Sequence, residues 1–258
     1  MTAQPTPEDI REFWNSRAGL AMAAGSRDIV AKQLEIEAIA AYLRDGTRVL
    51  DAGCGNGVTA IEMARRFEVD LTAFDFAPDM VRHAEEAASD QTLRGRVSFS
   101  VGDVQNPPSD ATGFDVIYTE RVLINLTDWP AQASAIRALT SRLKPGGKYV
   151  MCENSQDGLD QINRLRERVG LEVIPVPWHN RYFRDQELQT FASPGVRLAE
   201  VNYYSSTYYF LSRVANAWLA ARERTEPSYD APLNQLALKL PPIGELGQGR
   251  IWVWERTQ

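Results

Sequence analysis

Short apolar runs alternate with amphipathic stretches through the middle of the chain. The apolar runs predict five strands, at 48–50, 69–74, 96–101, 114–118 and 147–151. Apolar residues between these runs recur at helical spacing and predict helices over 58–67, 78–88 and 130–143. Strands that alternate with helices form βαβ units with right-handed crossovers, so we expect an α/β fold built on a parallel sheet.

The two ends of the chain follow less regular patterns. Before the first strand, we expect helices over 6–14 and 26–44, the second capped by Ser26. After the fifth strand, we expect an insertion of helices and loops in which Pro175 and Pro177 keep the chain extended. The helices expected after the fifth strand are 159–169, 185–191, 210–222 and 233–240, and the strands are 196–204 and 250–255.

The composition is that of an ordinary globular protein and narrows the choice of partners. The chain has 258 residues, of which 44% are hydrophobic and 24% charged, and its formal net charge is -6. Because nucleic-acid-binding proteins usually carry a basic surface, this balance favours a small substrate over a nucleic acid. No apolar stretch approaches the ~18 residues of a membrane span, and the polar start lacks a secretory signal, so we expect a cytoplasmic protein without a membrane partner. With two cysteines and two histidines, we expect no metal site.

A glycine-rich loop joins the first strand to the next helix. Gly53, Gly55 and Gly57 permit a tight turn and a close approach of the backbone to a ligand, whose polar group can meet the free N–H groups at the helix start. Asp75 lies 22 residues after Gly53, at the end of the second strand, where an acid can accept hydrogen bonds from ribose hydroxyls. Together these features indicate a nucleoside site. The dinucleotide pattern G-x-G-x-x-G would need its third glycine one residue later than Gly57.

The stretch 49–57 resembles the first motif of class I S-adenosylmethionine-dependent methyltransferases. Four later segments resemble further motifs of that family, in the same order: 74–80, 102–104, 114–123 and 143–147. The resemblance covers roughly Asp45 to Glu153. It implies a Rossmann-like, doubly wound sheet of seven strands, mostly parallel, whose last strand is antiparallel and is formed by 250–255.

The resemblance also implies a cofactor, S-adenosylmethionine, and residues that hold it. Asp51 would orient the loop and the charged end of the cofactor, Asp75 would hold the ribose, and Asp103 would accept the adenine amine. Trp14 and Arg17 would cover the cofactor and meet its carboxylate, or else pack an N-terminal helix onto the core. Glu120 and Arg121 would line the methionine end, or else pair on the surface. The remaining residues implied at the cofactor are Gly53, Gly55, Asn56, Gly57, Phe76, Met80, Gly102 and Val104.

The acceptor side is expected in the insertion, near the carboxyl end of the fifth strand. His179 lies in an aromatic and polar cluster with Trp178, Arg181 and Tyr182, and we expect these side chains near the transferred methyl group. Arg181 could hold an anionic group, and His179 could act as the base. Glu153 is a second candidate base, expected to face the crevice at the strand ends. The alternatives are that His179 is a surface residue and that Trp178 and Tyr182 only pack the insertion onto the core.

The sequence therefore predicts transfer of a methyl group from S-adenosylmethionine to an oxygen or nitrogen atom of a small polar metabolite. A loose likeness over 151–182 suggests a sugar-like acceptor. The alternatives are an NAD-type oxidoreductase on the same scaffold and a catalytically silent nucleoside-binding subunit. We expect one domain over 1–258, divided into N-terminal lid helices (1–44), a cofactor-binding core (45–153), a substrate-pocket insertion (154–195) and C-terminal strands and helices (196–258).

Overall fold

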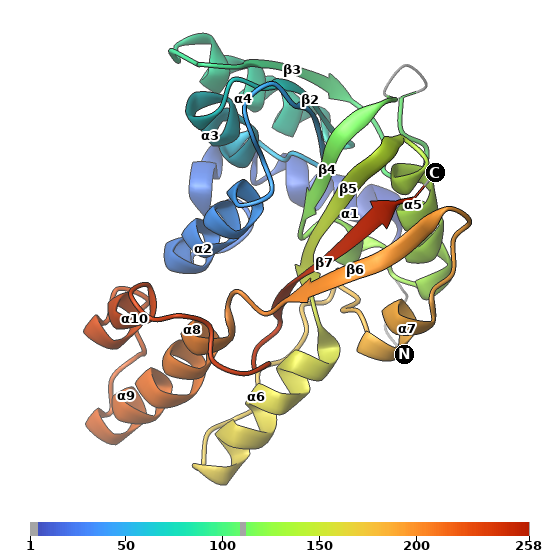
Figure 1. The fold of residues 1–258 in the computed structure, drawn as a ribbon. Helices are drawn as coiled ribbons and strands as arrows, with labels where there is room; N and C mark the ends of the chain where they lie inside the picture. Colours follow the sequence, from blue (N-terminus) through green and yellow to red (C-terminus); the bar gives the residue numbers. More distant parts are fainter. Residues whose placement is uncertain (1–4, 109–111, 258) are drawn as a thin grey trace.

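A seven-stranded sheet organises the computed structural model, which describes residues 5–108 and 112–257 (Figure 1). The strand order is β3-β2-β1-β4-β5-β7-β6. Neighbouring strands pair in parallel from β3 to β5, whereas β7 runs antiparallel to both β5 and β6. The predicted mostly parallel sheet with an antiparallel last strand is confirmed. The strands are β1 (Arg48–Ala52), β2 (Asp70–Asp75), β3 (Arg96–Val101), β4 (Phe114–Glu120), β5 (Leu143–Asn154), β6 (Val196–Asn202) and β7 (Gly249–Arg256).

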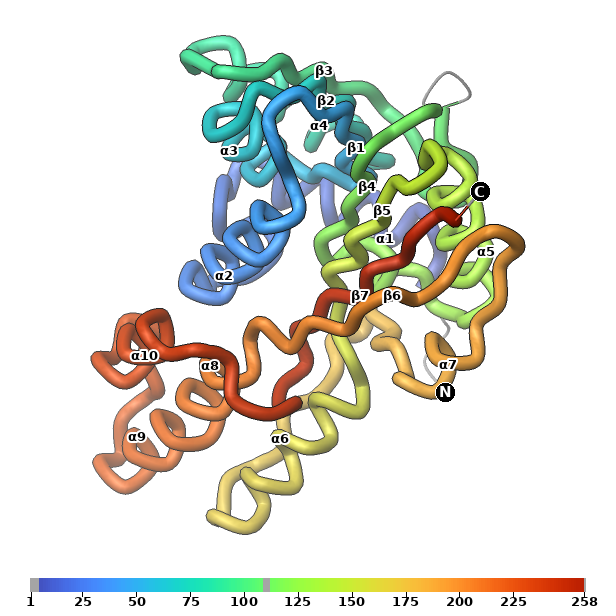
Figure 2. The backbone as a smooth tube through the Cα atoms, viewed as in Figure 1, coloured from blue at the N-terminus to red at the C-terminus, as the bar shows by residue number. Residues whose placement is uncertain are grey.

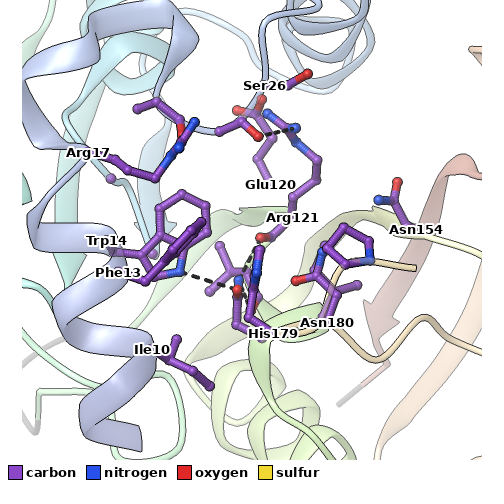
Figure 3. A pocket seen from close by; sticks show the side chains of 18 of the residues that line it. Ile10, Phe13, Trp14, Arg17, Ser26, Glu120, Arg121, Asn154, His179 and Asn180 are labelled. Atoms are coloured by element: carbon purple, nitrogen blue, oxygen red, sulfur yellow. Dashed lines mark hydrogen bonds between the residues drawn. The ribbon is translucent and has the colours of Figure 1, made fainter. Parts of the chain in front are cut away.

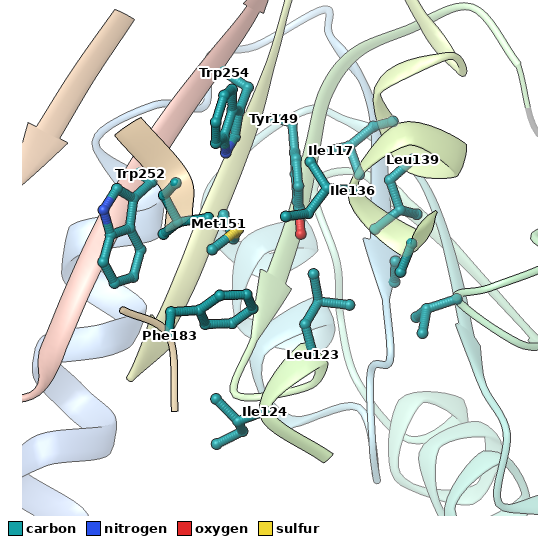
Figure 4. Close-up of a cluster of buried hydrophobic side chains, with 14 of the residues drawn as sticks. Ile117, Leu123, Ile124, Ile136, Leu139, Tyr149, Met151, Phe183, Trp252 and Trp254 are labelled. Carbon is teal, nitrogen blue, oxygen red and sulfur yellow. The ribbon is translucent and has the colours of Figure 1, made fainter. Parts of the chain in front are cut away.

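Helices cover both faces of this sheet because strand residues alternate between two apolar clusters. Ile117 of β4 and Tyr149 of β5 pack with α5 (Trp129–Thr140), as Figure 4 shows for the side chains of this cluster. Tyr118 and Val150, their chain neighbours, belong to the opposite cluster with α2 (Ile29–Ala40) and α3 (Val58–Arg66). Successive side chains of a strand point to opposite faces, so one strand serves both cores.

The helix before β1 starts later than the sequence predicts. Its first residue is Ile29, and Asp28 rather than Ser26 is its cap, because the Asp28 Oδ1 atom accepts a hydrogen bond from the Ala31 N–H at 3.0 Å. Ser26 lies in the preceding turn, where its hydroxyl accepts from the Asp28 N–H. The helix ends at Ala40 and not at Arg44.

The remaining helices lie at the start of the chain, after β2, after β4 and after β5. Figure 2 shows α6 with α8, α9 and α10 beyond the ends of β5 and β7. The helix expected over 210–222 is longer and contains a π-helical turn, η3. None of the helices in the described part of the chain has the length and apolar composition needed to cross a membrane. The bounds are α1 (Pro7–Asn15), η1 (Ala18–Ala23), α4 (Pro78–Ser89), η2 (Leu123–Asn125), α6 (Gln156–Arg168), α7 (Asp185–Thr190), α8 (Ser206–Phe210), η3 (Leu211–Asn216), α9 (Ala217–Glu223) and α10 (Pro232–Ala237).

A buried ion pair attaches α7 to the sheet. Arg250 of β7 is 1% exposed and pairs with Asp185 at the start of α7. The Arg250 guanidinium also donates to the Glu245 carbonyl oxygen at 3.0 Å and lies over the Tyr203 ring. A buried guanidinium without its carboxylate would keep its desolvation cost and lose the attraction that offsets it.

We expect Asp185→Ala to lower the free energy of unfolding by about 3–5 kcal/mol, because it leaves Arg250 buried and unpaired. Arg197→Ala is the matched control, since it breaks a pair with Glu255 in which Arg197 is 59% exposed. Its cost should stay below about 1 kcal/mol. Urea unfolding measures both values, and equal losses for the two variants would contradict the importance of the buried pair.

Candidate active site

A cavity of about 750 Å³ opens at the carboxyl edge of the sheet. Its walls come from the N-terminal segment, from the loops after β1 to β4, from the chain after β5 and from the C-terminal helices (Figure 3). The strand order places β1 between β2 and β4, so the connections leave it in opposite directions and open a crevice at the strand ends. A cavity of this size and position is typical of a small-molecule or cofactor site.

The glycine loop after β1 lies against this cavity. Gly53 has a φ of +85°, and a side chain there would collide with Val122. Gly55 has a φ of +53°, and no atom lies within 4 Å of the position that its Cβ would take, because that side of Gly55 faces the cavity. The loop therefore requires glycine for its backbone and offers bare backbone to a ligand. Gly57, in contrast, packs against Ala84 and does not line the cavity.

Asp75 closes the loop from the end of β2. Its carboxylate accepts hydrogen bonds from the Gly55 N–H at 2.8 Å and from the Ala77 N–H at 2.9 Å. Burial raises the pKa of Asp75 to about 6, although these backbone N–H groups lower it. The structure also brings other predicted cofactor residues to this part of the cavity, namely Phe76, Met80, Gly102, Asp103 and Val104.

Two further acids line the cavity next to β1 and β4. Asp51 is buried and accepts a hydrogen bond from the Tyr118 hydroxyl at 2.7 Å, and burial raises its pKa to about 8. Glu120 accepts from the Lys32 ammonium and from the Thr59 hydroxyl, each at 2.5 Å. Glu120 therefore has a buried pair inside the cavity, not one on the surface.

Three charged side chains on α2 and its N-cap were missed by the sequence reasoning. Asp28, Lys32 and Glu35, which we call the α2 charge stripe, all line the cavity. Asp28 pairs with Arg213 at 2.5 Å, and Glu35 pairs with Arg121 at 3.2 Å. Spacings of four and three residues put these charges on one helical face, and that regularity within an apolar stretch was a detectable signal.

Arg121 crosses the cavity from the end of β4. In Figure 3 its side chain extends toward Ser26, and its guanidinium lies close to Gly25 as well as to Glu35. Its backbone has a φ of +56°, in the left-handed region that non-glycine residues rarely adopt. Such conformations cost of order 1–3 kcal/mol and concentrate at functional sites.

The N-terminal segment covers the cavity and is tied to it by polar contacts. The Trp14 indole N–H donates to the Asn125 Oδ1 atom at 3.2 Å, and the Asn56 amide donates to the Ala18 and Ala21 carbonyl oxygens at 3.1 and 3.0 Å. Arg17 lines the cavity, but its Nε–H already donates to the Ala24 carbonyl oxygen at 2.5 Å.

His179 contacts this segment through aromatic packing. Its ring lies 4.4 Å from the Phe13 ring and 5.9 Å from the Trp14 ring, centroid to centroid. Its Nδ1 atom is buried and has no hydrogen-bond partner among the residues that the structure describes, and burial, with Arg17 nearby, lowers its pKa. His179 therefore lies in the cavity wall as a neutral ring that packs the insertion against the N-terminal segment.

The insertion places only part of its predicted cluster at the cavity. His179 and Tyr182 line it, but Trp178 is 58% exposed and does not. Arg181 was expected to hold an anionic group, and this expectation is wrong, because its guanidinium is bound to Gln132 and Glu187 outside the cavity. The cavity instead receives amides and phenols that the sequence did not single out, from Asn154, Asn180, Tyr209, Tyr229 and Gln248.

Glu153 does not face the crevice, so that expectation is also wrong. It is buried inside the sheet layer, and its carboxylate accepts from the N–H groups of Val122 and Leu123 at 3.0 Å and of Ile124 at 3.3 Å. Burial raises its pKa to about 7, although these backbone groups lower it. Alternate strand residues point to opposite sides, so its neighbour Asn154 reaches the cavity instead.

A sequence model of the methyltransferase-domain family matches residues 43–173. The chain belongs to this family. The predicted resemblance to class I S-adenosylmethionine-dependent methyltransferases is thereby confirmed, and the alternative of an NAD-type oxidoreductase gains no support.

Curated relatives match about half of this methyltransferase chain. It is 35% identical to phosphoethanolamine N-methyltransferase 3 of Arabidopsis thaliana over 146 residues, which are 55% of this chain and 29% of the relative. It is 34% identical to 27-O-demethylrifamycin SV methyltransferase of Amycolatopsis mediterranei over 139 residues, which are 52% of this chain and 50% of the relative. The chain thus spans half or less of the length of these relatives.

Solved structures share the fold over nearly the whole methyltransferase chain. Magnesium protoporphyrin IX methyltransferase from Synechocystis PCC 6803, with bound SAH, superposes with a TM-score of 0.63 at 15% identity and covers 97% of this chain and 100% of its own. The [4+2]-cyclase SpnF superposes with a TM-score of 0.61 at 21% identity and covers 99% of this chain and 98% of its own. At these identities, the similarity establishes the fold alone.

S-adenosylmethionine is the cofactor of this family, and the residues of the cavity fit it. Asp75 offers carboxylate oxygens for ribose hydroxyls, Phe76 and Met80 offer apolar surface for the adenine, and Gly55 leaves bare backbone beside them. Asp51 and Glu120 offer carboxyl oxygens at the next part of the wall, where the cationic end of the cofactor would lie.

We expect Glu153→Ala to destabilise the methyltransferase by about 3–5 kcal/mol, because it leaves buried N–H groups of 122–124 without an acceptor. Glu153→Gln keeps one acceptor oxygen and should lose only about 1–2 kcal/mol. Urea unfolding measures both losses. A Glu153→Ala protein with unchanged stability and lost turnover would instead return Glu153 to the candidates for the base.

Proposed function

We propose that this methyltransferase transfers the methyl group of S-adenosylmethionine to an oxygen or nitrogen atom of a small polar acceptor. One observation carries the proposal. A single cavity runs from the glycine loop and Asp75, past Asp51 and Glu120, to a compartment lined by Asn154 and other amides and phenols. A nucleoside-binding end and a polar acceptor end within one cavity are what a two-substrate transfer requires.

The bound cofactor supplies a methyl group that its positive sulfur already activates. The residues of this chain therefore have to orient the acceptor, exclude water and accept a proton. The N-terminal segment, through Trp14 and Phe13, closes the cavity against the insertion. Tyr182 is 7% exposed and contacts the side chains of Asn154 and Asn180, so its hydroxyl is held in a defined position at the acceptor end.

The acceptor that fits this compartment carries several hydroxyl groups. Amide and phenol side chains both donate and accept hydrogen bonds, as hydroxyl groups do. Three amides and three phenols line the compartment, from Asn154, Asn180, Gln248, Tyr182, Tyr209 and Tyr229. We therefore keep a sugar-like acceptor as the proposed class, and a panel of hydroxylated metabolites with radiolabelled S-adenosylmethionine tests it. If the only labelled acceptors were amines that carry no hydroxyl group, the result would contradict this class.

The alternative of a silent nucleoside-binding subunit is tested by the same panel. The [4+2]-cyclase among the structural neighbours shows that this fold also carries an activity other than methyl transfer. Binding of S-adenosylmethionine without transfer to any acceptor in the panel would favour this alternative.

We expect Asp75→Ala to weaken S-adenosylmethionine binding by ~1.5–3 kcal/mol, which is the usual contribution of a hydrogen bond to a charged group. Titration calorimetry measures the change. Asp79→Ala is the control, since Asp79 lies nearby in α4 but does not line the cavity. Unchanged affinity in Asp75→Ala, or an equal loss in Asp79→Ala, would refute the ribose assignment.

Two variants of His179 separate a base from a packing residue. If His179 is the base, both His179→Ala and His179→Phe remove it, and each variant should lower kcat by ~10²–10⁴-fold. We propose packing, because the ring contacts both Phe13 and Trp14, so His179→Phe should keep most of the turnover while His179→Ala raises KM. Steady-state kinetics with an acceptor from the panel decides, and equal losses of kcat in the two variants would make His179 the base.

A further inference from the structure

Two carboxyl groups meet in the wall of the cavity. Glu35 of α2 and Glu120 of β4 both line it, and their side chains are in hydrogen-bonding contact. Glu35 is 2% exposed, and within residues 5–108 and 112–257 no N–H or O–H group donates to its Oε2 atom. Two carboxylates repel each other, so this contact requires one proton between them. We call Glu35 and Glu120 the carboxyl pair.

The neighbouring cations decide which member of the pair carries the proton. Burial raises the pKa of Glu35, and Arg121 only partly offsets this effect. Burial would also raise the pKa of Glu120, but the Lys32 ammonium, the hydrogen bond with Glu35 and the Arg121 guanidinium together lower it. The proton therefore resides on Glu35 while no further cation is near.

Other titratable groups face the carboxyl pair from the elements packed around it. They are Asp51 of β1, Tyr118 of β4, Cys152 of β5, Tyr204 and Tyr209. Burial raises the pKa of each phenol and of the thiol, so these groups stay neutral near neutral pH. Asp51, whose pKa burial raises to about 8, is the neighbour that could exchange a proton in the same range, and it needs a control of its own.

We infer that the carboxyl pair exchanges its proton with the charge on the cofactor's sulfur, being ionised beside the sulfonium and protonated once the sulfur is neutral. The inference rests on the proposed function. While Glu35 is protonated, two positive charges, on Lys32 and Arg121, face one negative charge on Glu120. Ionisation of Glu35 adds a second negative charge, and a cation brought into the cavity favours that ionised state.

The reaction itself returns the proton. Methyl transfer breaks the methyl–sulfur bond, whose electron pair stays on sulfur, and a lone pair of the acceptor oxygen or nitrogen forms the new bond to carbon. The sulfur loses its positive charge, and the acceptor atom loses its proton. The Glu35 carboxylate takes up that proton, so the total charge within the cavity stays constant through the step. A constant charge avoids an uncompensated ion in a site where water screens poorly.

Titration calorimetry on the unmodified protein tests the inference without turnover. S-adenosylmethionine and S-adenosylhomocysteine share every charged group except the sulfonium. Each is titrated at about pH 7 in phosphate, HEPES and Tris, whose ionisation enthalpies differ, so the slope of the observed enthalpy counts the protons exchanged. We expect S-adenosylmethionine to release up to about one proton more than S-adenosylhomocysteine.

Variants assign the difference to the carboxyl pair. Glu35→Gln keeps a hydrogen bond to Glu120 through its amide and should abolish the difference between the two ligands. Glu37→Gln, whose side chain on the same helix is 62% exposed, should retain it. Asp51→Asn alters the cofactor wall and should weaken the binding of both ligands, but the difference in proton release between them should persist. In turnover assays, Glu35→Gln should lower kcat about 10²-fold or more and flatten a profile in which kcat otherwise rises with pH.

Three results would overturn the inference. Equal proton release by the two ligands would exclude any link to the sulfur charge, although the proposed function would stand. A difference that persists in Glu35→Gln and disappears in Asp51→Asn would move the proton to Asp51. Failure of both ligands to bind the unmodified protein would overturn the proposed function, and the inference with it.

Discussion

The pairing of buried charges at the carboxyl edge of the sheet is the constraint on which the rest of this structure depends. A charge taken out of water costs several kcal/mol unless a partner and hydrogen bonds compensate it. Lys32 with Glu120 attaches α2 to β4, Asp28 with Arg213 attaches the π-helical turn to α2, and Arg250 with Asp185 attaches α7 to β7. Apolar packing builds the sheet and its two cores, but these pairs determine where the flanking segments lie.

Two of these pairs, Lys32 with Glu120 and Asp28 with Arg213, also form part of the wall of the cavity, so stability and function share residues. The α2 charge stripe compensates charges at the strand ends, and it also surrounds the place where a cationic cofactor would lie. The carboxyl pair is the part of this wall that is not fully compensated, because two acids contact each other there. Arg121 pairs with Glu35 from a left-handed backbone conformation. Strained conformations of this kind concentrate at functional sites.

The pattern of residues predicted the cofactor side of the site well and the acceptor side poorly. Gly55 and Asp75 belong to motifs in which the backbone itself forms the site, and the local turn at the end of each strand places them. Glu153 and Arg181 were expected in the cavity because their segment ends there. The Glu153 side chain points to the other side of its strand, and the Arg181 side chain is bound to Glu187 and Gln132. Proximity along the chain predicts the edge of the sheet that a residue reaches, but not the direction of its side chain.

The sequence by itself determined the strands, the helices between them, the glycine loop and the acid that follows it, because periodicity and turn chemistry act over a few neighbouring residues. Only the tertiary structure decided that Asp28, Lys32 and Glu35 face the cavity, that His179 packs against Phe13, and that Tyr209 and Arg213 complete the wall. These contacts join parts of the chain far apart in sequence. They depend on which buried charges and rings come into contact when the flanking segments pack on the sheet. A local sequence pattern does not contain that information.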